Sequence, residues 1–221
     1  MGELFSTYNI FGAFGLTLLL TFFAAIGSLV IGTIVAVLRV SPIPLLQKVG
    51  ALYVNIWRNT PLTLIIIACN IVMIVNLGFS FSADIARDNI YWAIIGLSVY
   101  HGAFVCEALR SGVNTVPPGQ AEAARSVGLT FGQSLREVML PQAFRGAITP
   151  LGNTLIALTK NTTVATAIGV AEIAGLQRTM LEDRIDLFGP IILIVAAGFV
   201  IITLPMGLLT SYLSTRLAVK R

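Results

Sequence analysis

A cluster of polar side chains interrupts an otherwise apolar segment of the sequence. Lys160, Asn161, Thr162 and Thr163 lie within the stretch 146–171, in which Lys160 is the only charged residue. A cation inside an apolar segment is costly, so it usually faces a cavity or a partner. One interpretation is that the four residues line a solute pathway and attract a carboxylate group. The alternative is a structural pair of Lys160, for example with Glu107 or with a main-chain carbonyl at a helix break.

Four further ionisable residues lie within or beside apolar segments. Arg58 is close enough to the end of its segment for the long side chain to reach the membrane surface, which favours anchoring over a pathway role. His101 is the only histidine, and a single histidine more often packs through a hydrogen bond than relays protons. Glu107 and Arg110 are one helical turn apart, so a local ion pair is expected. Arg58 and Glu107 remain candidates for the pathway.

The residue patterns of an enzyme are absent from the sequence. A single histidine excludes H-E-x-x-H, and no serine lies in G-x-S-x-G. No lysine directly follows a glycine, which excludes a loop that wraps nucleotide phosphates around such a lysine. The cysteines, Cys69 and Cys106, lie in apolar stretches where a thiol packs readily. We therefore expect no catalytic residue, no metal site and no cofactor bound by this chain.

The composition is that of a polytopic membrane protein. Of the 221 residues, 56% are hydrophobic and only 11% are charged, whereas about a quarter are charged in soluble proteins. The net charge is +4, but the basic residues are dispersed at segment ends and form no basic, aromatic face. Nucleic acid is therefore not expected as a partner.

Uncharged stretches predict an all-α fold with five membrane-spanning helices and one domain over residues 1–221. The spans are expected at about 10–38, after Arg58 to about 77, 89–106, 146–171 and 187–215. Pro150 and Gly152 predict an irregular or broken fourth span. In the first span, four small residues repeat every fourth position, either as a face for close helix packing or by chance. These residues are Ala24, Ser28, Gly32 and Ala36.

Loop charges predict the orientation of these spans. Alternate loops carry nine basic residues on one side and three on the other. The nine are Arg39, Lys48, Arg110, Arg125, Arg136, Arg145, Arg216, Lys220 and Arg221, and the three are Arg87, Arg178 and Arg184. Because basic loops stay in the cytoplasm, the N-terminus is expected outside and the C-terminus inside. The loop between the third and fourth spans is then cytoplasmic.

That loop is predicted to form a helical hairpin over about 117–141. Pro117 breaks the preceding helix, and a run of strong helix formers follows. Gly128 ends this first helix as a glycine at the C′ position would. Thr130 and Gln133 then form a T-x-x-Q capping box, and apolar residues follow at helical spacing up to Pro141.

The hairpin sequence resembles the EAA loop of the membrane subunits of bacterial ABC importers. The match consists of Glu122, Ala123, Ala124, Gly128, Val138, Leu140 and Pro141. In that family the first short helix, the coupling helix, docks on a cytoplasmic ATP-hydrolysing subunit. The resemblance implies that the coupling residues here are Gln120, Glu122, Ala123, Ala124, Arg125 and Gly128. The alternative is an ordinary amphipathic hairpin at the membrane surface.

Other stretches resemble the polar amino acid branch of these importers, the histidine, glutamine, glutamate, arginine and opine type. The sequence 55–62, NIWRNTPL, is similar to the F-R-G-T-P-L element of that branch, and 107–128 and 140–173 are similar to the regions around its EAA loop. Asn59 departs from the usual glycine, and 161–163 departs from the usual D-T-S. The overall resemblance is to glutamate or glutamine uptake permeases of Gram-positive bacteria.

This resemblance implies a multi-pass subunit of the bacterial cell membrane that forms half of a translocation pathway. Its expected partners are two cytoplasmic ATP-binding subunits that carry ATP and Mg, a second permease subunit of the same or a related sequence, an extracellular substrate-binding protein and a polar amino acid. A secondary, ion-coupled amino acid transporter is the alternative, although five spans without a repeat are few for a complete carrier.

Overall fold

The computed structural model describes residues 2–217, and every regular element in that range is helical. The α-helices are α1 (Gly2–Thr7), α2 (Ile10–Val40), α3 (Pro44–Asn59), α4 (Leu62–Asn70), α5 (Ile85–Val113), α6 (Pro118–Ser126), α7 (Phe131–Gln133), α8 (Leu140–Gly146), α9 (Ile148–Asn161), α10 (Ile173–Asp183) and α11 (Phe188–Leu217). Wider π-helical turns form η1 (Ile71–Asn76) and η2 (Ser134–Met139), and tighter 3₁₀ turns form η3 (Thr162–Ile168) and η4 (Ile185–Leu187). Lys220 and Arg221 lie outside the described residues.

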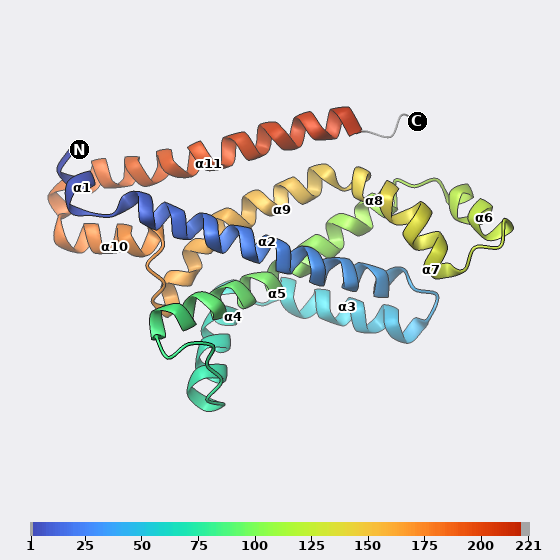
Figure 1. Cartoon of the computed structure of the whole chain (residues 1–221), viewed down its shortest axis with the longest axis horizontal. Helices are drawn as coiled ribbons and strands as arrows, with labels where there is room; N and C mark the ends of the chain where they lie inside the picture. The colour runs from blue at the N-terminus through green and yellow to red at the C-terminus, as the bar shows by residue number, and fades with distance from the viewer. Residues whose placement is uncertain (1, 218–221) are drawn as a thin grey trace.

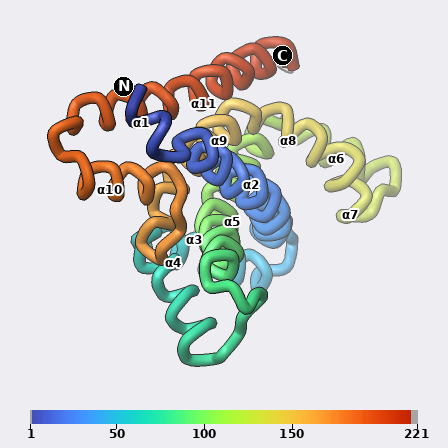
Figure 2. The backbone as a smooth tube through the Cα atoms, turned by 60° about the vertical axis from the view of Figure 1, so that its left-hand side comes forward, coloured from blue at the N-terminus to red at the C-terminus, as the bar shows by residue number. Residues whose placement is uncertain are grey.

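The long helices run along the long axis of the molecule (Figure 1). These helices are α2, α3, α5, α9 and α11. The turn between α2 and α3, the α6–α7 hairpin and the C-terminal end of α11 lie at one end, and the N-terminus and α10 lie at the other. Figure 2 also shows α10 and the hairpin on opposite sides of the molecule. The predicted all-α, polytopic class is confirmed.

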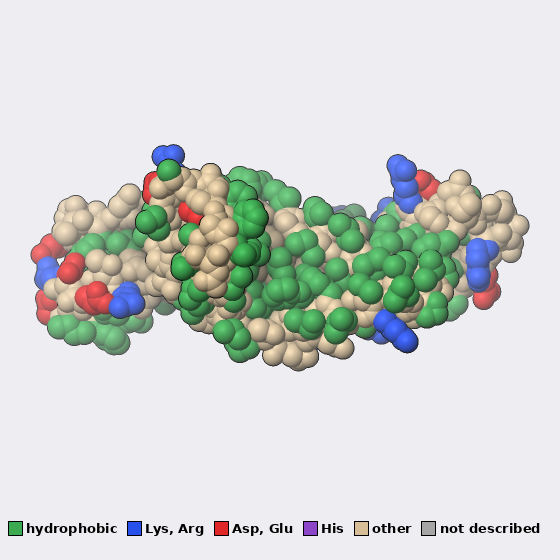
Figure 3. Space-filling view, turned by 90° about the horizontal axis from the view of Figure 1, so that it is seen from below, with side chains coloured by type: hydrophobic (Ala, Val, Ile, Leu, Met, Phe, Trp, Pro, Cys, Tyr) green, Lys and Arg blue, Asp and Glu red, His purple; other side chains and the backbone are tan. Residues whose placement is uncertain are grey.

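Three helices in the described range are long and apolar enough to cross a membrane: Ile10–Val40, Ile85–Val113 and Ile185–Leu217. They agree with the predicted first, third and fifth spans. A fourth candidate is the pair Pro44–Asn59 and Leu62–Asn76, which is bent by 100°. Figure 3 shows hydrophobic side chains across the middle of one face, with charged side chains towards its ends. This is the distribution that a bilayer selects.

The bend corrects the predicted second span, which was expected to begin after Arg58. Instead α3 already begins at Pro44 and carries Arg58 in its last turn. Thr60 is extended, with φ −100° and ψ 132°, because the ring of Pro61 disfavours a helical conformation at the preceding residue. Lys48, predicted in a loop, therefore lies within a helix. The predicted end near residue 77 agrees with the end of η1 at Asn76.

Small residues allow α2 to pack closely against α5. The predicted repeat is buried along its whole length: Ala24, Ser28, Gly32 and Ala36. A Cβ atom on Gly32 would lie 2.5 Å from the Val105 side chain and 2.8 Å from the carbonyl oxygen of Gly102. A larger residue could not fit there without moving α5. The repeat therefore is a packing face, as small-residue repeats are in membrane proteins.

The predicted fourth span, 146–171, is not among the described helices that are long and apolar enough to cross a membrane. It is irregular, but not at the predicted place, because Pro150 and Gly152 lie within the regular helix α9. The α-helix α9 changes at Thr162 into the 3₁₀ segment η3, which ends at Gly169 with φ +80°. The helix α10 that follows was not predicted, because this part was interpreted as an outer loop. Its first residue Ile173 and its residue Met180, seven positions later, are both fully buried. That spacing, with Glu172 as N-cap, was a usable signal for an amphipathic helix.

Candidate functional site

The hairpin has the geometry that its sequence predicts. Gly128 adopts φ +86°, and its N–H donates to the Arg125 carbonyl at 2.9 Å while the Leu129 N–H donates to the Ala124 carbonyl at 3.1 Å. These two bonds form a Schellman motif, which ends α6 with a left-handed glycine. Thr130 and Gln133 make both bonds of the predicted capping box. The turn and the start of the second helix are therefore both fixed locally.

Most of the predicted coupling residues are exposed on α6 and its turn. The exposed set comprises Gln120, Glu122, Ala123, Arg125 and Gly128. Ala124 is only 5% exposed and packs inward, so it supports the hairpin and cannot form its outer surface. Within residues 2–217, neither Glu122 nor Arg125 forms an ion pair. Both charges are available to an external partner.

Val127 is a surface feature that the sequence interpretation missed. Its apolar side chain is 78% exposed at the tip of the hairpin, beside Gly128. A single exposed apolar side chain is common on protein surfaces, so Val127 is of interest because it lies beside the exposed charges of α6. The signal in the sequence was an apolar residue directly before the turn glycine. A side chain at the end of a short helix has few neighbours that could bury it.

The second helix of the hairpin continues through Pro141, where the sequence predicted its end. A proline ring normally clashes with the carbonyl four residues earlier. Here the preceding turns are π-helical, and the Leu140 N–H donates to the Leu135 carbonyl, five residues back. Because the wider π turn needs no N–H at the proline, Pro141 fits near the start of α8. The hairpin is therefore continuous with α8.

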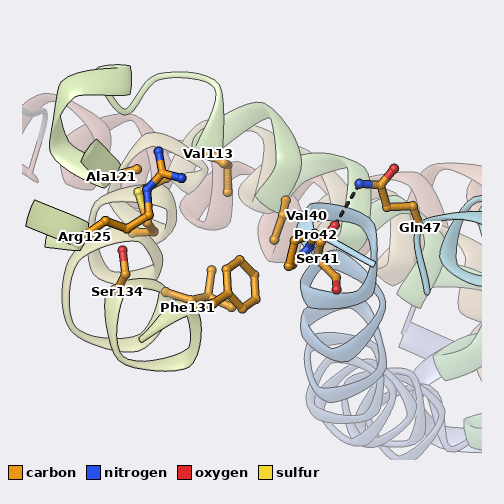
Figure 4. Close-up of a pocket in the computed structure, with 11 residues that line it drawn as sticks. Val40, Ser41, Pro42, Gln47, Val113, Ala121, Arg125, Phe131 and Ser134 are labelled. Carbon is orange, nitrogen blue, oxygen red and sulfur yellow. Dashed lines mark hydrogen bonds between the residues drawn. The ribbon is translucent and has the colours of Figure 1, made fainter. Parts of the chain in front are cut away.

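A cleft of roughly 350 Å³ separates the hairpin from the turn between α2 and α3 (Figure 4). Val40, Ser41 and Pro42 line one wall, and Ala121, Arg125, Phe131 and Ser134 line the other. Gln47 fixes the first wall by donating to the Ser41 carbonyl at 2.8 Å. Because this space is open, α2 does not directly support the tip of the hairpin. Its main connection to the spans runs through α8 and α5.

The structure brings part of the predicted pathway cluster together around α5. The Asn161 amide nitrogen lies 3.2 Å from Nε2 of His101. The His101 ring packs against Tyr100 and Phe104, with centroids 5.2 and 5.9 Å away. The Arg58 guanidinium lies over the Phe104 ring, 5.4 Å from its centroid, which is within the range of a cation–π interaction. Sequence alone predicted neither the His101–Asn161 pair nor the aromatic support.

Lys160 is exposed beside this cluster and does not pair with Glu107. Glu107 instead forms ion pairs with Arg39 and, at 3.6 Å, with the predicted partner Arg110. Glu107 therefore joins α5 to the end of α2. Among the described residues, no carboxylate lies within ion-pair distance of Lys160. Its ammonium group is free to meet an anion.

The two threonines of the cluster differ in their surroundings. Thr162 is fully buried and donates to the Thr159 carbonyl at 2.8 Å, whereas Thr163 is half-buried and donates to the Lys160 carbonyl at 2.8 Å. Both hydroxyls thus satisfy main-chain groups where α9 becomes η3. Residues 2–217 contain no group of three His, Cys, Asp or Glu side chains placed to hold a metal ion.

Comparisons with known proteins agree with this arrangement. Residues 28–220 match the family described as "Binding-protein-dependent transport system inner membrane component". The chain is similar to the glutamate transport system permease protein GluC of Corynebacterium glutamicum, with 48% identity over 95% of this chain and 94% of the relative. It is also similar to the probable glutamine ABC transporter permease protein GlnM of Bacillus subtilis, with 35% identity over 91% and 89% of the two chains.

The fold is shared with a solved transporter structure. A crystal structure of an amino acid ABC transporter with histidines superposes with a TM-score of 0.77 at 26% identity, covering 94% of this chain and 93% of that chain. The predicted membership of the ABC importer membrane subunits, which was based on the EAA loop, is therefore confirmed. The alternative of a secondary, ion-coupled transporter is excluded. The chain belongs to the binding-protein-dependent inner-membrane transport components, as a non-hydrolytic multi-pass permease of an ABC transporter that works with ATPase and binding-protein partners.

Proposed function

We propose that this permease serves ATP-driven uptake of glutamate or glutamine across the bacterial cell membrane. The substrates named for GluC and GlnM support this assignment. The exposed cations Arg58 and Lys160 are suited to the α-carboxylate of an amino acid or the side-chain carboxylate of glutamate. Between them, the Asn161 amide and the aromatic rings of α5 offer neutral contacts.

Coupling to the ATPase is proposed to occur through the exposed surface of the hairpin. The observation that carries this proposal is the rigid Schellman turn at Gly128, which presents Glu122, Arg125 and Val127 to solvent. ATP and Mg would be bound by two partner ATPase subunits. Closure of those subunits on ATP would move the two coupling hairpins, and the permease would alternate between outward and inward access.

The proposed topology has five spans, with the N-terminus outside and the C-terminus in the cytoplasm. Its support is the arrangement in Figure 1, where the hairpin, the α2–α3 turn and the end of α11 share one end of the molecule. Arg39, Lys48, Arg125 and Arg136 belong to that end, as expected for a cytoplasmic face. The chain is proposed to be one permease domain, with the hairpin over about 117–141.

One chain would form half of the pathway, along a surface that includes Lys160, Asn161, Thr163 and Arg58. A second permease subunit, identical or related, would supply the other half. A binding protein would deliver the amino acid from outside. Glu107 is better placed to stabilise the α2–α5 contact, and Thr162 to stabilise the α9–η3 junction.

The proposed substrate is tested by uptake into proteoliposomes that contain the copurified complex and its binding protein. Labelled glutamate and labelled glutamine are each competed with a panel of unlabelled amino acids. The proposal expects competition by glutamate or glutamine and weak competition by arginine and histidine. Uptake driven by an ion gradient without ATP, or preferred uptake of a cationic amino acid, would contradict it.

A further inference from the structure

Glu172 is fully buried at the start of α10. Within residues 2–217, no arginine or lysine forms an ion pair with it. Burying a carboxylate without a cation is costly unless hydrogen-bond donors surround it. The position therefore requires a compensating set of donors.

Donors surround both carboxylate oxygens of Glu172. Oε1 accepts from the Thr166 hydroxyl at 2.6 Å and from the Gly175 N–H at 3.1 Å. Oε2 accepts from the Ala174 N–H at 3.0 Å. The Thr17 hydroxyl lies 3.5 Å from Oε2 and 3.2 Å from the Ala13 carbonyl, and it accepts from the Ile173 N–H at 3.4 Å. Each oxygen thus faces one backbone N–H, which can only donate. A glutamine would place its NH₂ group against one of them, so the site is built for a carboxylate.

These bonds connect three elements: the successive segments η3 and α10, and α2, which is distant from both in sequence. Thr166 belongs to η3, the segment that follows Lys160 and Asn161, whereas Thr17 belongs to α2. On the other side of η3, the Ile168 carbonyl accepts from the Asn89 side chain of α5 at 2.6 Å. The segment η3 is therefore held from both sides, and Glu172 links it to the outer helix α10.

We propose that Glu172 is a positioning residue for transport, which holds η3 and α10 in register against α2. This role rests on the proposed pathway beside Lys160, because η3 sets the backbone directly after that residue. The carboxylate touches no substrate and acts through Thr166 and the N-terminus of α10. It thereby couples the outer surface, where a binding protein would dock, to the pathway segment.

The test compares Glu172→Gln with Glu182→Gln in the reconstituted complex of permease, ATPase and binding protein. Glu182 lies on the same helix, but it is exposed and pairs with Arg178 at 2.8 Å. Uptake of labelled glutamate and glutamine and ATP hydrolysis are measured per assembled complex, with and without loaded binding protein. The ratio of stimulated to basal hydrolysis reports communication between the outer surface and the ATPase.

Glu172→Gln is expected to lower uptake per complex by about tenfold or more, the effect of losing one charge-assisted hydrogen bond. It should also lower the ratio of stimulated to basal hydrolysis, whereas Glu182→Gln should change neither. An unchanged ratio per assembled complex would overturn the role, because a purely structural defect lowers only the amount of complex. If the wild-type complex transports neither amino acid, the proposed function fails instead.

If the complex with Glu172→Gln does not assemble, a second variant tests the positioning role of Glu172. Thr166→Val removes only the hydroxyl donor at 2.6 Å and leaves both backbone donors in place. A lowered ratio of stimulated to basal hydrolysis in this variant supports the role of Glu172. A wild-type ratio and wild-type uptake per complex would overturn it.

Discussion

Gly112 of α5 lies directly against the main chain of Ala143 in α8. A Cβ atom at Gly112 would overlap the Ala143 carbonyl oxygen and would lie 2.9 Å from both the Ala147 nitrogen and its Cβ. The two backbones thus touch where α8 continues from the hairpin. Because packed helices transmit displacement with little compression, this contact is the most direct route from the hairpin to the spans.

Gly112→Ala should weaken this route. The added methyl group forces α5 and α8 apart, at a cost of about 1–3 kcal/mol for overpacking. We expect a lower melting temperature of the purified complex and less uptake per ATP hydrolysed. Gly119→Ala is the control, because a Cβ there meets nothing within 4 Å. Equal stability and coupling in the two variants would show that the close contact is dispensable.

Gly128→Val should separate ATP hydrolysis from uptake while the spans remain inserted. A Cβ at Gly128 meets no atom within 4 Å, so the effect comes from the positive φ, which costs roughly 1–2 kcal/mol for a residue with a side chain. The matched variant Gly128→Asn should retain more coupling, because asparagine tolerates this conformation. The measurement is uptake per ATP hydrolysed, and full coupling of the valine variant would refute the role of the turn.

Lys160→Met should raise the substrate concentration needed for half-maximal uptake. Losing one exposed cation that meets a carboxylate is expected to weaken binding by about tenfold, or roughly 1.4 kcal/mol. Lys48→Met removes an exposed cation of α3 and should leave uptake unchanged. Wild-type uptake and affinity in the Lys160 variant would exclude this residue from the pathway.

The end of the molecule that carries the N-terminus and α10 has a charge network. Arg184 donates to both carboxylate oxygens of Asp186, at 3.0 and 2.9 Å. Arg184 also forms an ion pair with Glu3, which ties the N-terminus to this network.

Local signals made the hairpin predictable from sequence. Gly128, the Thr130–Gln133 box and Pro117 each act on the neighbouring backbone, and the structure contains the features that they predict. The lengths of the uncharged stretches likewise predicted three of the apolar helices. The small-residue repeat of α2 could be identified, but its partner α5 could not, because sequence spacing does not specify which helix faces it.

Tertiary pairing accounts for most of what the sequence did not predict. Arg39 pairs with Glu107 across 68 positions, and Asn161 meets His101 across 60 positions. Contacts between residues so far apart in the sequence leave no local sequence pattern from which they could be predicted. The break before Pro61 was locally encoded, but α3 is not visible as an uncharged stretch, because Lys48 and Arg58 lie within it. Similarly, Pro141 continues a helix only because the preceding π turns accommodate its ring.

Contact between the hairpin and the ATPase is tested most directly by placing a photoreactive amino acid at Val127. This side chain is 78% exposed at the hairpin tip, and Ile185, which is 70% exposed at the opposite end of the molecule, provides the control site. Illumination of the assembled complex should join the ATPase subunit to position 127 and not to position 185. An assembled, ATP-hydrolysing complex without an adduct at position 127, or with equal adducts at both sites, would contradict the coupling role of the hairpin.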